Sequence, residues 1–159
     1  MRFLACLACW CCFAVAQAEQ TQCLPGEAVL FSCRFANKVL SICGTGATNQ
    51  DLTYRYGRID RPELVYPNSG AKGAFLQSSS TLIGGGELRI EFDRGDYTYV
   101  IFSRVRRSEP DDDGRREPIF EDGLRVSRAG KPVIDKLCDD SGAGFRGAVN
   151  LPEARRAQP

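Results

Sequence analysis

Histidine is absent from this sequence, and methionine and tryptophan occur once each. The missing imidazole excludes the histidine-based catalytic triads and every metal site that uses histidine ligands. A surplus of one charge is also lacking, because 21 lysines and arginines stand against 20 aspartates and glutamates. The sequence therefore gives no reason to expect nucleic acid or an anionic membrane as a partner.

A long apolar segment is lacking as well. The apolar run 3–15 is shorter than the ~20 residues that a membrane span needs, so we expect no transmembrane segment. Arg2 precedes this run and Ala16-Gln17-Ala18 follows it, which is the pattern of a secretory signal peptide. We predict a cleaved leader over 1–18, a single β-domain over 19–145 and a flexible tail over 146–159, in a periplasmic or secreted protein.

Half of the eight cysteines lie in this leader, and four remain: Cys23, Cys33, Cys43 and Cys138. An even number in an exported chain indicates two disulfides, and the spacing does not resemble that of a zinc site. Val29, Phe31 and Cys33 alternate onto one strand face, and Leu40 and Ile42 form the apolar set of the next strand. If these sets share the core, Cys43 faces away from Cys33. This favours Cys23–Cys43 and Cys33–Cys138, although three connectivities are open.

Short apolar or alternating runs with turn signals between them fill the rest of the chain. The runs are 29–34, 39–43, 52–56, 63–66, 87–92, 97–104, 124–127 and 133–137. No convincing helical period interrupts them. We predict an all-β fold, an antiparallel β-sandwich or small barrel of roughly seven to nine short strands, stabilised by disulfides.

Three segments between these runs are predicted to be irregular. Residues 68–80 form a surface loop, Gly84-Gly85-Gly86 a flexible bend, and 104–117 a charged loop. In the run 87–92, Leu88, Ile90 and Phe92 are predicted to face the core, and Glu87, Arg89 and Glu91 the solvent.

No catalytic residue, cofactor or metal ligand emerges from the motifs. Carboxylates cluster at 111–113 and 139–140, and a pair of acids is what glycoside hydrolysis needs. Both clusters lie in polar segments flanked by glycine, which indicates solvated loops. A serine nucleophile would need a lysine base, and no Ser-x-x-Lys is present. A small carboxylate-dependent envelope hydrolase therefore stays an alternative without a supporting motif.

One stretch interleaves aromatic rings with guanidinium groups. Its candidate binding residues are Tyr54, Arg55, Tyr56, Arg58 and Tyr66. Such a surface would grip a glycan or an acidic partner by stacking and bidentate contacts. The alternative interpretation is that the tyrosines belong to the core and the arginines to the solvated surface.

The order of the segments 27–34, 38–43, 54–58 and 62–67, followed by the hairpin around 95–101 and by Lys136-Leu137-Cys138, resembles a group of exported bacterial proteins without an assigned activity. The resemblance covers roughly Cys23 to Cys138 and implies an envelope location and a β-rich disulfide domain.

A looser similarity links the chain to periplasmic inhibitors of C-type lysozyme, which place a cysteine on an early hairpin. Those inhibitors use a Ser-Gly loop followed by a tyrosine, whereas Ser69-Gly70 and Ser141-Gly142 lack that tyrosine. The sequence thus predicts an exported, non-enzymatic binding module whose partner is an envelope protein or glycan. A lysozyme inhibitor and the hydrolase remain the alternatives.

Overall fold

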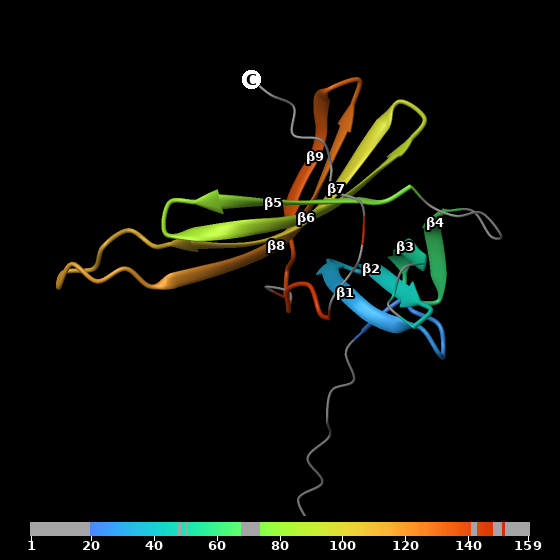
Figure 1. Cartoon of the computed structure of the whole chain (residues 1–159), viewed down its shortest axis with the longest axis horizontal. Helices are drawn as coiled ribbons and strands as arrows, with labels where there is room; N and C mark the ends of the chain where they lie inside the picture. The colour runs from blue at the N-terminus through green and yellow to red at the C-terminus, as the bar shows by residue number, and fades with distance from the viewer. Residues whose placement is uncertain are drawn as a thin grey trace, which may run out of the picture.

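The computed structural model describes residues 20–47, 49, 51–67, 74–140, 143–147 and 151, which contain nine strands in two antiparallel sheets and no helix (Figure 1). The sheets do not close into a barrel, so the sandwich form of the predicted all-β fold is confirmed. The predicted leader, 1–18, lies outside the described residues. No described segment is an apolar helix of the length that a membrane span requires.

The first sheet has the order β1-β2-β3-β4 and is built from consecutive hairpins. Its strands are β1 (Ala28–Phe35), β2 (Lys38–Thr45), β3 (Asp51–Arg58) and β4 (Arg61–Tyr66). A bulge between Val29 and Phe31 shifts the register of β1, so Val29 pairs with Cys43 while Phe31 pairs with Ile42. Val29 therefore does not share a face with Phe31, contrary to the simple alternation.

The second sheet has the order β5-β6-β7-β8-β9. Its strands are β5 (Leu76–Leu82), β6 (Gly85–Arg94), β7 (Tyr97–Arg107), β8 (Pro118–Arg128) and β9 (Lys131–Leu137). The strands β6, β7 and β8 are longer than those of the first sheet, and one end of them continues past it as an arm (Figure 1). The charged loop is confined to 108–117, because β7 extends to Arg107 and takes up the predicted loop residues 104–107; its end is as predicted, since β8 begins at Pro118.

The core lies between the two sheets, where both contribute their apolar faces. Phe92 of β6 stacks on Tyr66 of β4 at 4.2 Å and on Tyr99 of β7 at 4.9 Å between ring centroids. Tyr54 and Phe75 complete this aromatic cluster. Large rings packed in tilted and stacked pairs supply much of the apolar area that a domain of this size can bury.

Two disulfides join segments that are distant in the sequence. Cys23 bonds to Cys43, and Cys33 of β1 bonds to Cys138, which follows β9. This is the pairing that the hairpin pattern favours. The second bond connects the first sheet to the second, and it closes a separation of 105 residues.

The other two segments predicted to be irregular are also partly strand. Residues 76–80, placed in the predicted surface loop, belong to β5, whose serine-rich sequence lacks the apolar alternation that signals a strand. Gly85 and Gly86 begin β6 rather than forming a flexible bend, and only Gly84 lies in the turn, at φ +74°. The Val105 carbonyl stands where a Cβ on Gly85 would lie, so close strand contact explains this glycine.

The segment after β9 returns to the first sheet. The Arg146 N–H donates to the Leu30 carbonyl at 2.7 Å, Phe145 packs on Phe31, and Leu151 packs against the core. Packing therefore continues past residue 145, the predicted end of the β-domain.

Candidate functional site

A pocket of about 500 Å³ opens where the β1–β2 turn meets the end of β9. Its lining residues come from both sheets: Phe35, Ala36, Asn37, Lys38, Tyr56, Lys136, Leu137 and Asp139. A volume of this size accommodates a small organic ligand or one to two sugar rings.

The pocket lining combines apolar and polar side chains. The rings of Phe35 and Tyr56 meet edge to face at 6.3 Å, and Leu137 lies beside them among the lining residues. Lys38 Nζ lies 5.4 Å from the centre of the Tyr56 ring and 2.6 Å from a Glu63 carboxylate oxygen. The hydrogen bond from Lys38 to Glu63 raises the pKa of the lysine, so its ammonium stays charged.

Lys136 supplies the second ammonium group of the pocket. It is exposed and makes no ion pair with any residue that the structure describes, so its charge is available to a ligand. Asp139 is the one carboxylate among the lining residues, and its Oδ2 already accepts the backbone N–H of Ala36. Lys38 is paired with Glu63, so Lys136 is the cation of the lining that lacks a carboxylate partner among the described residues.

The two halves of the pocket are held together by covalent and hydrogen bonds. The Cys33–Cys138 disulfide lies two residues before Phe35 on one side and one residue before Asp139 on the other. The Asp139 N–H donates to the Arg34 carbonyl at 2.8 Å, which adds a second tie beside the disulfide. Such ties fix the geometry of a site before a ligand arrives.

The predicted tyrosine and arginine surface is divided by the fold. Tyr54 is 1% exposed and lies in the aromatic cluster, where burial raises the pKa of its hydroxyl. Arg55 is buried on the other face of β3, and its guanidinium donates to both oxygens of Glu27 at 2.5 and 2.8 Å. Neither residue can form part of an exposed stacking surface, and the core interpretation holds for Tyr54.

The other three residues of that surface also separate. Tyr56 lines the pocket, whereas Tyr66 packs on Phe92 and accepts the N–H of Ala74 through its hydroxyl at 3.2 Å. Arg58 is exposed at the end of β3 and does not line the pocket. Of the five predicted binding residues, Tyr56 is the one that the structure brings to a concave site.

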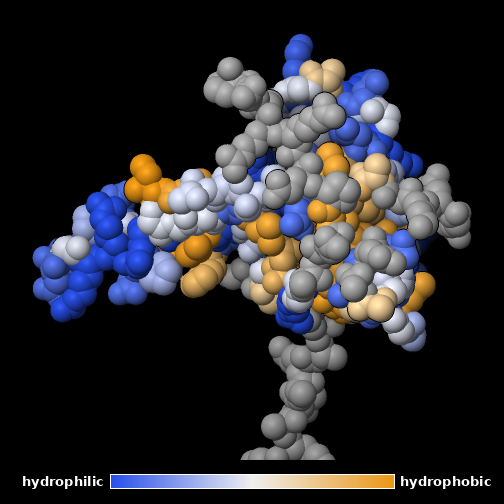
Figure 2. Space-filling view, in the orientation of Figure 1, coloured by the Kyte–Doolittle hydropathy of each residue, from blue (hydrophilic) through white to orange (hydrophobic). Residues whose placement is uncertain are grey.

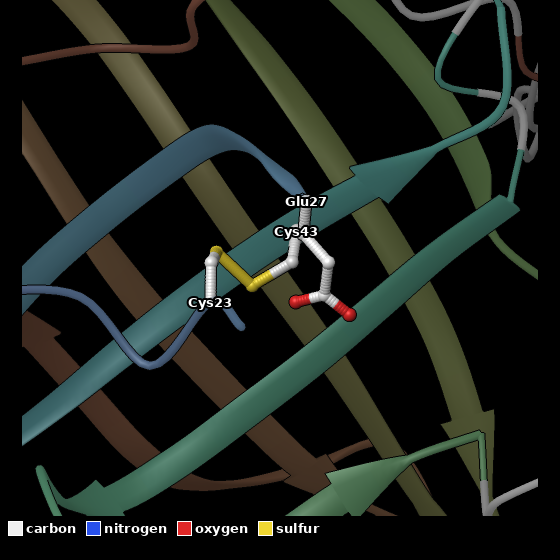
Figure 3. Close-up of side chains that lie close together, drawn as sticks. All are labelled: Cys23, Glu27 and Cys43. Atoms are coloured by element: carbon white, nitrogen blue, oxygen red, sulfur yellow. A yellow bond between two sulfur atoms is a disulfide. The ribbon is translucent and has the colours of Figure 1, made fainter. Parts of the chain in front are cut away.

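A second cluster joins Glu27 to the Cys23–Cys43 disulfide (Figure 3). The two sulfurs are bonded to each other and the carboxylate is held by Arg55, so this set does not offer free metal ligands. Burial opposes ionisation of Glu27, but hydrogen bonds from Arg55 and from the Leu24 N–H outweigh it, and the pKa of the carboxyl falls below its usual value. Cys33, Cys138 and Asp140 form a similar group, again around a disulfide.

The face of the second sheet that points away from the core carries a dense ionic network. Glu87, predicted to face the solvent, has a side chain only 3% exposed and contacts the guanidinium groups of Arg89, Arg104 and Arg125. Arg125 in turn covers the ring of Phe102 at 4.0 Å. Glu87 does point away from the core, but long arginine side chains bury it, an effect that alternation does not predict.

On the same strand, Leu88 was predicted to face the core and is 36% exposed instead. Leu88 shares the inward-pointing face with the exposed Phe120 but lies in the arm, where the first sheet does not cover it. Figure 2 shows separate hydrophobic patches on this arm. The period of a strand identifies its faces and does not reveal where the covering sheet ends.

The carboxylates considered for hydrolysis are engaged in turns. Asp111 Oδ1 accepts the N–H groups of Asp113 and Arg115, which shapes the exposed loop between β7 and β8. Asp139 and Asp140 are exposed and accept backbone N–H groups of Ala36 and Arg34. The Ser-Gly pairs compared with the lysozyme inhibitors, 69–70 and 141–142, include residues outside those that the structure describes.

Sequence reasoning missed Asn37, Lys38 and Lys136 as site residues. Asn37 and Lys38 read as ordinary hairpin-turn residues, and Lys136 lies 98 positions after Lys38. The predicted Cys33–Cys138 disulfide could have indicated this site, because a bond between the two cysteines brings their neighbours in the sequence together.

Comparison with known proteins gives no match: no family model fits the chain, and neither a curated protein nor a solved structure is similar to it.

Proposed function

We propose that this chain is an exported, non-enzymatic binding module of the bacterial envelope, and that its pocket holds an acidic glycan. The observation that carries the proposal is the composition of the pocket lining: the Tyr56 ring, the Asn37 amide and the Lys136 ammonium, which forms no ion pair with a described residue. A sugar ring offers an apolar face to an aromatic side chain and hydroxyl groups to an amide. A carboxylate or phosphate substituent matches the ammonium.

Two further features support the proposal, one for the compartment and one for the non-enzymatic role. Both disulfides suit an oxidising compartment, and the second one ties the pocket together. The carboxylate pair that glycoside hydrolysis needs is not found among the described lining residues, since Asp139 is the single acid there.

Calorimetric titration of the oxidised protein tests the proposal. Trigalacturonate should bind, whereas maltotriose, the neutral trisaccharide, should bind at least about tenfold more weakly, because it lacks the charged contact. Lys136→Gln should weaken trigalacturonate about tenfold, and Tyr56→Ala should do so while Tyr56→Phe keeps the ring and most of the affinity.

The matched control is Lys131→Gln, which removes the same charge from the other end of β9, outside the pocket. Its affinity should equal that of the unmodified protein. Equal binding of the two trisaccharides, or an equal loss in Lys131→Gln and Lys136→Gln, would show that the pocket does not select an acidic sugar.

A further inference from the structure

The outer edge of β5 differs from the other sheet edges of the described chain. An edge strand presents unpaired N–H and C=O groups, and proteins block them with charges, prolines, bulges or covering segments. Backbone hydrogen bonds from Asp139 and Arg146 reach β1. The edge strand β4 begins Arg-Pro-Glu, and β9 begins Lys-Pro and carries further charges.

The strand β5 carries none of the devices that its own sequence and pairing could supply, namely a charge, a proline or a bulge. Its sequence is Leu-Gln-Ser-Ser-Ser-Thr-Leu, without charge or proline. Its pairing with β6 runs without a bulge from Leu76 opposite Glu91 to Leu82 opposite Gly85. No described strand pairs with its other side, and Figure 1 shows it along one edge of the arm.

The sequence of β5 is also nearly symmetric about its centre. If two copies pair in antiparallel fashion around Ser79, Leu76 lies opposite Leu82, Gln77 opposite Thr81, and Ser78 opposite Ser80. Each pair matches in polarity, the two chains bring no like charges together, and opposed hydroxyl groups can bond to each other.

We propose that β5 is a self-association edge, where a second copy of this chain adds its own β5 around a two-fold axis at Ser79. The two five-stranded sheets then form one continuous antiparallel sheet. The symmetry of β5 selects this occupant, because an unrelated strand would gain nothing from the matched order of its residues. The same register brings Ile83, which is 100% exposed, beside the start of β5 in the second copy.

Substitutions that place a charged side chain at the two-fold axis test this proposal directly. Sedimentation of the unmodified protein should show a reversible dimer below about 0.5 mM. Ser79→Lys and Ser79→Glu each place two like charges side by side, so each variant alone should dimerise at least about tenfold more weakly. An equimolar mixture of the two variants should dimerise again, because opposite charges then meet at the two-fold axis. A variant that fails to fold could not recover in this way.

Disulfide trapping gives a second readout. Ser79→Cys should form a covalent dimer on mild oxidation, since opposite residues in an antiparallel pair lie within about 4.5–5.5 Å, inside disulfide range. Val133→Cys on the β9 edge is the control and should stay monomeric. The proposal would be overturned if the unmodified protein were a monomer at about 0.5 mM, or if both charge variants dimerised as well as the unmodified protein. Equal trapping at Val133, or pairing of β5 only with an added foreign peptide, would also overturn it.

Discussion

Removal of the Cys33–Cys138 disulfide should destabilise the protein more than removal of Cys23–Cys43. A cross-link restricts the unfolded chain, and the restriction grows with the length of the loop. For separations of 105 and 20 residues, the chain-entropy relation gives about 4.8 and about 3.3 kcal/mol at 25 °C. The difference, about 1.5 kcal/mol, is large enough to measure.

The two double variants, C33A/C138A and C23A/C43A, form a matched comparison. Each removes one cysteine that is 1% exposed, Cys33 or Cys43, and one that is half-buried, so the packing losses are similar. Urea unfolding followed by circular dichroism should place the midpoint of C33A/C138A below that of C23A/C43A. Equal midpoints or the reverse order would refute the loop argument. The first variant should also lose glycan affinity, because its disulfide ties the pocket, while the second should keep it.

The ionic network and the close strand contacts of the second sheet lead to further predictions. Burial opposes ionisation of Glu87, but hydrogen bonds from Arg125 and Arg89 outweigh it and lower the pKa of the carboxyl. On acidification, the Glu87 carboxylate therefore takes up its proton at a higher pH in the unfolded chain than in the folded one. The stability that Glu87 contributes is complete above the ordinary carboxyl pKa of 4.5, and it is lost as the pH falls through the lower pKa of the folded protein. Glu87→Gln should cost about 2 kcal/mol at neutral pH and flatten the decline of stability in acid; an unchanged acid profile would contradict this. Gly123→Ala should cost about 2 kcal/mol or more, because the added Cβ would lie 2.5 Å from the Phe102 ring, while Gly86→Ala, whose nearest contact is 3.4 Å, should stay within about 0.5 kcal/mol. Thermal melting checks the pair, and equal shifts would contradict the packing argument.

The parts of the fold that follow from local pattern were predictable from the sequence. Ile90 and Phe92 alternate with polar residues, and both lie in the core as expected. The faces of β1 and β2 also separated Cys33 from Cys43 correctly, although the bulge at Leu30 moved Val29 to the other side. The strand β5 was not predicted, because Ser78, Ser79 and Ser80 join the sheet through backbone bonds to β6 rather than through apolar burial.

The site depends on contacts between distant segments, which local pattern cannot supply. Tyr56 was among the candidates because of its neighbours in the sequence, but Lys136 reaches the same pocket because the Cys33–Cys138 disulfide and the Asp139–Arg34 hydrogen bond hold the end of β9 beside β1. Arg55 was chosen as a surface cation, and its partner Glu27 lies 28 positions away. The pairing of such charges determines whether an arginine is available to a ligand.

The most direct test of the pocket as an acidic-glycan site is a titration of the isotope-labelled, oxidised protein with trigalacturonate, followed by amide NMR. The account predicts progressive shifts confined to the pocket, at Asn37, Lys38, Tyr56 and Lys136, with maltotriose producing far smaller ones. No shifts up to about 10 mM ligand, or shifts centred on the arginine-covered face around Phe102, would contradict it.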